Sequence, residues 1–161
     1  MPKRIYDFLP LSRENALTML AIYRYREEIA EKIQLKRERL TISSMYMETW
    51  KAFGAALQCV AQSVWLEKIC KKVNNALDKI KCRDIILSII EHKQPPIMSD
   101  CTERHKYRLR NIFFKRFCYN LCVEGLTDNY IEENKLYSVF NEWRNVGRET
   151  IESTRGRKIK N

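Results

Sequence analysis

Only four glycines and four prolines punctuate this chain of 161 residues. A β-rich fold of this length needs many tight turns, and tight turns draw heavily on Gly, Pro, Asn and Asp. The scarcity of these residues therefore favours a few long helices. Because 45% of the residues are hydrophobic, the chain can bury one core of ordinary size. We predict an all-α fold, a single compact bundle of five or six helices with a long first helix.

The pattern of apolar residues and capping residues divides the first half of the chain. We predict an extended lead-in over residues 1–11, a helical domain over 12–147 and a basic flexible tail over 148–161. Ser12 is placed to cap a helix that runs to about Leu40. After a break at residues 41–44 the next helix continues to Leu77, with a close helix crossing at Gly54 and a kink near residues 62–63.

The second half divides in the same way. A shorter apolar helix over residues 80–90 is followed by the clearest loop of the chain, at residues 95–96. Asp100 precedes a helix that continues through Cys122 and ends with Gly125 as the residue after its cap. Residues 127–128 cap a last helix, which ends at Gly147.

The net charge points to a class of partner. Thirty Lys and Arg residues against twenty Asp and Glu residues leave a charge of +10, spread over the whole chain. Such a fold attracts polyanions or an anionic membrane surface, and it does so less at high salt. The sequence has no apolar signal segment, and no stretch reaches the roughly 18 apolar residues of a membrane span. We expect a cytoplasmic or nuclear location, with the cysteines as free thiols.

The densest positive run is RHKYRLRNIFFKR, residues 104–116, which contains six Lys or Arg residues and no acid. It falls where a helix is expected to begin, the end at which the helix dipole disfavours cations. Arg guanidinium groups bind phosphate bidentately, and an aromatic ring can stack on a base. The alternative is a solvated helix face whose Lys and Arg stems cover apolar surface. The predicted nucleic-acid-binding residues of this run are Arg104, Lys106, Tyr107, Arg108, Arg110, Lys115 and Arg116.

Two other basic stretches add candidates for the same role. Residues 23–26 alternate tyrosine with arginine, a pattern that suits RNA or single strands, so Arg24 and Arg26 are included. Tyr25 also belongs to the apolar seam of the first helix, which favours a structural role for this stretch. In the tail, a short run typical of phosphate contacts or nuclear localisation supplies Arg155, Arg157 and Lys158.

Metal binding and catalysis have weak support in the sequence. Cys101, His105, Cys118 and Cys122 have the composition of a zinc ligand set. On one continuous helix the two pairs stand roughly 25 Å apart and cannot share an ion. No Gly-rich phosphate loop, nucleophile elbow or HExxH motif occurs. We predict no metal, no cofactor and no enzymatic activity, and we assign Cys59, Cys70 and Cys82 to the core.

Two classes of function remain open. The leading prediction is a non-catalytic basic protein that binds nucleic acid, RNA rather than DNA, mainly through phosphate contacts. The alternative is a helical adaptor or inhibitor that binds an acidic or helical protein through its positive or Met- and aromatic-rich surface. Residues 45–50, which include two methionines and Trp50, suit such a surface, although core packing is the favoured interpretation of them. A homo-oligomer is compatible with both classes.

Overall fold

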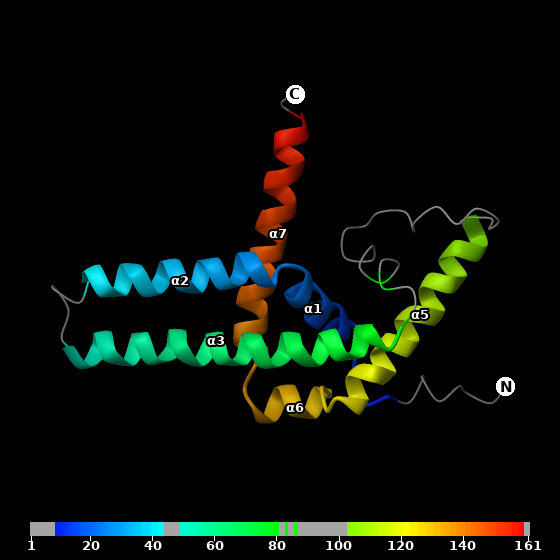
Figure 1. Ribbon diagram of the computed structural model, residues 1–161, viewed down its shortest axis with the longest axis horizontal. Coiled ribbons are helices and arrows are strands. Elements are labelled where there is room, and N and C mark those ends of the chain that lie inside the picture. The colour runs from blue at the N-terminus through cyan, green and yellow to red at the C-terminus, as the bar shows by residue number, and fades with distance from the viewer. Residues whose placement is uncertain (1–8, 44–48, 81–82, 84–85, 87–102, 160–161) are drawn as a thin grey trace.

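The computed structural model describes residues 9–43, 49–80, 83, 86 and 103–159 (Figure 1). Across these residues every regular element is a helix, which confirms the all-α prediction. The predicted helix over residues 80–90 lies mostly outside the described residues, as do the loop at residues 95–96, Cys82, Cys101 and the methionines at 45 and 47. The helices are α1 (Arg13–Arg24), α2 (Arg26–Ser43), α3 (Thr49–Asp78), α5 (Glu103–Val123), α6 (Asp128–Glu133) and α7 (Tyr137–Ile159).

The predicted long first helix is wrong, because the chain turns at Tyr25 and forms α1 and α2 instead. Tyr25 ends α1 with φ −105° and ψ 23°, and α2 leaves in another direction (Figure 1). Tertiary packing explains the turn. The buried ring of Tyr25 lies against Gly147 of α7, and the bend lets α1 pack on α7 and α5 while α2 pairs with α3. The longest described helix is α3, with 30 residues.

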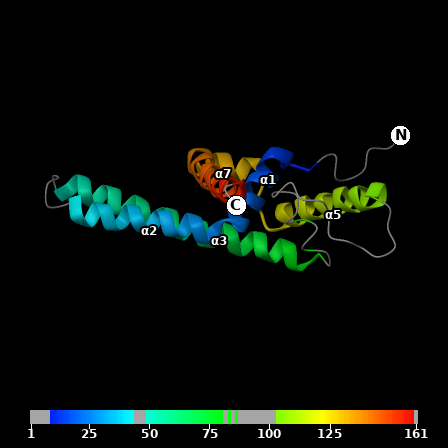
Figure 2. The same ribbon diagram turned by 90° about the horizontal axis from the view of Figure 1, so that it is seen from above.

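Helices α2 and α3 run side by side and form an arm, which is visible from two directions (Figures 1 and 2). α3 is continuous, so the kink predicted near residues 62–63 is absent from it. Gly54 is exposed, and a Cβ built on it would meet no atom within 4 Å, so the close crossing predicted there is wrong. Trp50 is 69% exposed, which overturns its assignment to the core.

The core lies where the end of α3 nearest Asp78 meets the remaining helices. Its largest fully buried side chains come from α1, α2, α3, α5 and α7, from the segment around α6, and from residue 86 between α3 and α5. Burying each of them stabilises the fold by about 1.5–3 kcal/mol, because its apolar surface leaves water. They are Met19, Leu20, Ile22, Ile29, Ile69, Leu77, Ile86, Phe117, Leu121, Leu126, Ile131 and Phe140.

Ser12 and Gly125 lie at the helix ends where the sequence predicts them. Ser12 caps α1 by accepting a hydrogen bond from the Asn15 amide at 3.2 Å. Gly125 has φ +84°, and its amide donates to the Cys122 carbonyl, as expected of the residue that follows a helix cap. The Asp128 carboxylate accepts bonds from the Ser12 amide at 2.9 Å and the Asn15 side-chain amide at 2.8 Å. These bonds fasten the start of α1 to the start of α6.

The predicted last helix is divided into two, and its second part runs further than expected. Thr127 caps α6 as predicted, but the chain turns after Glu133, where Lys135 adopts φ +54°. α7 then continues through Gly147 to Ile159, so the predicted helix end at Gly147 is wrong. Gly147 does not end the helix. It allows the Tyr25 ring to pack closely against α7, because a Cβ there would approach Cδ2 of Tyr25 to 2.8 Å.

We expect Gly147→Ala to destabilise the protein by about 1–2 kcal/mol, although alanine is the better helix former. The added methyl would overpack the Tyr25 contact at a cost of about 1–3 kcal/mol, against a helix-propensity gain of up to about 1 kcal/mol. Urea unfolding followed by circular dichroism measures the change. Gly54→Ala is the matched control, because its methyl meets open space, and it should raise stability. Stabilisation by both substitutions would contradict the close Tyr25–Gly147 packing.

Candidate nucleic-acid interface

Helix α5 presents one continuous polar face to solvent, which we call the α5 basic face. Its members follow one another at spacings of three or four residues, so they line a single side of the helix. The opposite side carries Phe114, Phe117 and Leu121, all buried, which fix the helix against the core. With a rise of 1.5 Å per residue the face is roughly 22 Å long. It consists of the exposed residues Arg104, Arg108, Asn111, Lys115 and Tyr119.

The electrostatics of this face are uniformly positive. No Asp or Glu occurs between residues 104 and 123. Arg104, Arg108, Lys115 and the exposed Arg116 form no ion pair within the part of the chain that the structure describes. Arg104 also lies in the first turn of α5, where the positive end of the helix dipole makes a cation unfavourable by about 0.3–1 kcal/mol. These charges are therefore available to an anion and contribute little to the fold.

Two exposed tyrosines border the basic residues. Tyr107 is 44% exposed and Tyr119 is 42% exposed. The Arg110 guanidinium lies 6.0 Å from the centre of the Tyr107 ring, so this half-buried arginine supports the ring rather than pointing freely outward. Tyr119 was not among the predicted residues, although its spacing of four from Lys115 would have indicated it. Flat aromatic faces beside cations can hold an unpaired base next to its phosphate.

The other predicted residues lie elsewhere. Arg24 is exposed at the end of α1. Arg155, Arg157 and Lys158 fall on the last two turns of α7, and Lys106 falls on α5. The side chains of these last four residues are outside the described part of the chain, so the α5 basic face is the surface on which the prediction can be assessed in detail.

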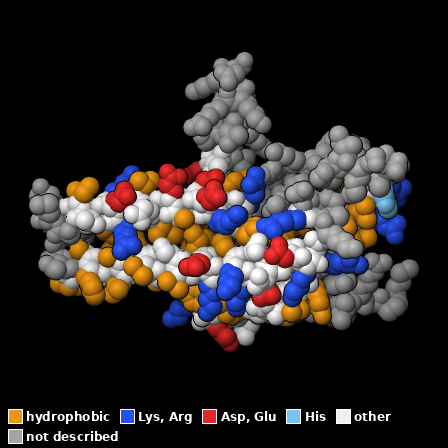
Figure 3. All heavy atoms as spheres, in the orientation of Figure 1, with side chains coloured by type: hydrophobic (Ala, Val, Ile, Leu, Met, Phe, Trp, Pro, Cys, Tyr) orange, Lys and Arg blue, Asp and Glu red, His pale blue; other side chains and the backbone are white. Residues whose placement is uncertain are grey.

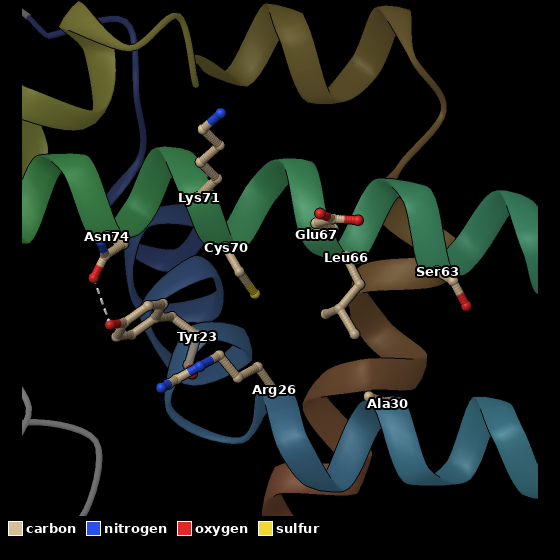
Figure 4. Close-up of a pocket in the computed structure, with 9 residues that line it drawn as sticks. All are labelled: Tyr23, Arg26, Ala30, Ser63, Leu66, Glu67, Cys70, Lys71 and Asn74. Carbon is tan, nitrogen blue, oxygen red and sulfur yellow. Dashed lines mark hydrogen bonds between the residues drawn. The ribbon is translucent and has the colours of Figure 1, made fainter.

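Arg26, Tyr23 and Tyr25 pack and bond at the turn between α1 and α2. Tyr23 and Tyr25 are 5% and 7% exposed, so neither ring is available to stack on a base. The Arg26 guanidinium lies 4.4 Å from the centre of the Tyr23 ring and donates to the Tyr23 carbonyl at 2.8 Å. Figure 4 shows Arg26 reaching back along α1 toward Tyr23. Arg26 thereby satisfies a carbonyl at the bend.

A cavity of about 610 Å³ opens beside this bend, between α1, α2 and α3. Figure 4 shows Cys70 and Leu66 of α3 pointing toward Arg26 and Ala30. The Tyr23 hydroxyl donates to Asn74 Oδ1 at 2.8 Å, and Arg83 contacts the same hydroxyl and lies over the ring. Tyr23, Arg26 and Asn74 of its lining are bonded to one another, and Glu67 places a carboxylate there, so the cavity offers less to an anion than the α5 basic face does.

Three of the cysteines within the described ranges are core residues, whereas Cys122 is half-buried. Cys59, Cys70 and Cys118 are buried. Burial raises the pKa of the Cys70 thiol to about 11, against a smaller opposing effect of Arg26, and raises the pKa of Cys118 to about 12. Both stay protonated at neutral pH, so neither is an activated nucleophile. Among the described residues no group of three or more His, Cys, Asp or Glu side chains is placed to hold a metal ion.

Comparison with known proteins identifies no relative of this chain. The chain matches no protein-family model, no curated protein and no solved structure. None of the helices within the described ranges is long and apolar enough to cross a membrane. The function is therefore inferred from the residues themselves.

Proposed function

We propose that this chain is a non-catalytic nucleic-acid-binding protein that takes single-stranded RNA on the α5 basic face. The observation that supports the proposal is the set of exposed cations Arg104, Arg108 and Lys115 on one side of α5, with no acid between residues 104 and 123. Arg104 and Arg108 stand one helical turn apart, so they would bind nearby phosphates of one strand.

The tyrosines favour a single strand over a duplex. Tyr107 and Tyr119 expose their rings beside the cations, and a ring can stack only on a base that is not already stacked within a helix. RNA is favoured over DNA because RNA recognition mostly targets unpaired bases on aromatic side chains. Most contacts would be to phosphates, so the proposal predicts strong salt dependence and little sequence preference.

Titration of the purified protein with a short labelled single-stranded RNA tests the proposal. If three phosphates are neutralised, the affinity should fall roughly 20-fold between about 50 mM and about 200 mM salt. The same strand in a perfect duplex should bind at least about tenfold more weakly, because it offers no base for Tyr107 or Tyr119. Fluorescence anisotropy measures both affinities.

A polyglutamate peptide in the same assay separates RNA from an acidic protein partner. It carries comparable negative charge without bases, so the proposal predicts weaker binding than to the RNA. Polyglutamate binding as tight as RNA binding, or duplex binding as tight as single-strand binding, would contradict the proposed function and favour the adaptor or inhibitor class.

A further inference from the structure

Arg13, the first residue of α1, lies against α5 at the edge of the α5 basic face. Its guanidinium carbon is 5.2 Å from the centre of the Phe114 ring. Burial is the largest cause of the raised pKa of the Cys118 thiol, and the nearby charge of Arg13 acts in the opposite direction. Phe114 and Cys118 are one helical turn apart, and Lys115 of the basic face lies in the same turn. Arg13 therefore brings a cation from a second helix to the level of Lys115.

The start of α1 is held in place by bonds to the start of α6. The Asp128 carboxylate accepts hydrogen bonds from the Ser12 amide and from the Asn15 side-chain amide. The Asp128 amide donates to the Pro10 carbonyl at 3.0 Å. Arg13 lies between Ser12 and Asn15 in the chain, so its backbone is anchored while its side chain extends to α5. Both views show α1 beside α5 near this point (Figures 1 and 2).

The Arg13 side chain is exposed, and its charge is not neutralised. It forms no ion pair with, and donates no hydrogen bond to, any residue in the part of the chain that the structure describes. The neighbouring acid, Glu14, pairs instead with Arg144 of α7 at 3.4 Å, and the Asp128 carboxylate is engaged by the bonds to α1. Arg13 also occupies the first turn of α1, where the helix dipole disfavours a cation. Its charge is therefore available to an anion.

The end of the molecule at which α5 begins is positive. Figure 3 shows Lys and Arg side chains, and no acidic one, beside the histidine at the right of the view. Since α5 carries no Asp or Glu from residue 104 to residue 123, a strand that follows the α5 basic face from Arg104 to Lys115 meets only cations and neutral groups on that helix. Arg13 adds a further cation at the level where Lys115 stands.

We propose that Arg13 binds a phosphate of the RNA strand next to the phosphate bound by Lys115, so that the binding surface spans two helices. This inference rests on the proposed function. The Phe114 ring supports the guanidinium on its inner side, and the exposed side is left for the strand. A guanidinium that is already ordered against a ring loses less freedom when it binds phosphate than a freely moving one does.

Arg13→Met tests the assignment in an anisotropy titration with the labelled single-stranded RNA. Methionine keeps an unbranched apolar chain over Phe114 without the charge, so the fold should be kept. We expect the affinity to fall about five- to tenfold at about 50 mM salt, and the salt slope to become shallower by about 0.7, the share of one phosphate. Arg37→Met is the matched control. It removes the same group from an exposed position on α2 and should bind within about twofold of the wild type.

Two further variants separate a phosphate contact from a packing role. Arg13→Lys keeps a positive charge and should retain most of the affinity, although lysine cannot bind phosphate bidentately. Arg13→Glu should weaken binding by more than about tenfold, while circular dichroism shows the fold intact, because an acid suits the first turn of α1. If Arg13 only covered the Phe114 ring, RNA affinity and salt slope would be unchanged in all three variants, and that result would overturn the assignment.

The outcomes also distinguish this inference from the proposed function. Suppose that the wild type binds RNA and that reversing the charges of Arg104, Arg108 and Lys115 abolishes binding, while every change of Arg13 is without effect. The α5 basic face then stands and the contribution of α1 is overturned. A wild type without salt-dependent RNA binding overturns both.

Discussion

Replacing Phe117 by alanine is expected to lower the free energy of unfolding by about 3–5 kcal/mol. Phe117 is completely buried on the inner side of α5, and its ring centre lies 6.3 Å from that of Phe114. The substitution removes a large apolar side chain and leaves a cavity that the surrounding helices can close only in part. Because native domains are stable by roughly 5–15 kcal/mol, a large part of the folded population should disappear on mild heating.

Urea unfolding followed by circular dichroism measures this effect, and Tyr107→Ala is its control on the same helix. Tyr107 is a ring of similar size but is 44% exposed, so its removal should cost about 1 kcal/mol or less. Equal effects of the two substitutions would contradict the orientation of α5, because they would imply that neither side of the helix is the buried side.

The sequence was sufficient for the elements whose signals are local. Ser12, Thr127 and Gly125 each act within one helical turn of their own position, and the structure confirms all three. The bend at Tyr25 and the glycine at 147 depend on one another across more than a hundred residues, since the Tyr25 ring occupies the space that a Cβ at Gly147 would need. No local sequence pattern predicts a contact between residues so far apart in the chain.

The same distinction holds for the surfaces. The sequence predicted the charge run at 104–116 and its place near a helix start. Tyr119 lies just beyond the run and was left out, although its spacing of four from Lys115 on the predicted helix places it on the same face. α3 was ambiguous for a different reason: both of its faces are apolar, and periodicity alone cannot tell which one the chain buries. The structure buries the face of Cys59 and exposes that of Trp50.

Reversing the charges of Arg104, Arg108 and Lys115 to glutamate is expected to weaken single-stranded RNA binding by about 100-fold or more at low salt. Three favourable phosphate interactions are removed and three repulsive ones are introduced, and 100-fold corresponds to about 2.7 kcal/mol. The salt slope should also become shallower by about two, at roughly 0.7 for each phosphate that is no longer neutralised. The fold should survive, because the three side chains are exposed and acids in the first turns of α5 suit its dipole.

A matched variant separates the effect of where the charges lie from the effect of the total charge. Lys36, Arg37 and Arg39 are exposed near the end of α2, at the end of the arm away from α5 (Figure 1). Their reversal to glutamate changes the total charge by the same amount. If binding were a general attraction to a positive protein, the two triple variants would weaken RNA binding equally.

The anisotropy titration of one labelled single-stranded RNA against the wild type and these two triple variants is the most direct test of the α5 basic face. We predict that the affinity of the α5 variant falls by about 100-fold and that most of its salt dependence disappears, while the α2 variant stays within a fewfold of the wild type. Equal decreases in both variants, or an α5 variant that binds as the wild type does, would contradict RNA binding on this face.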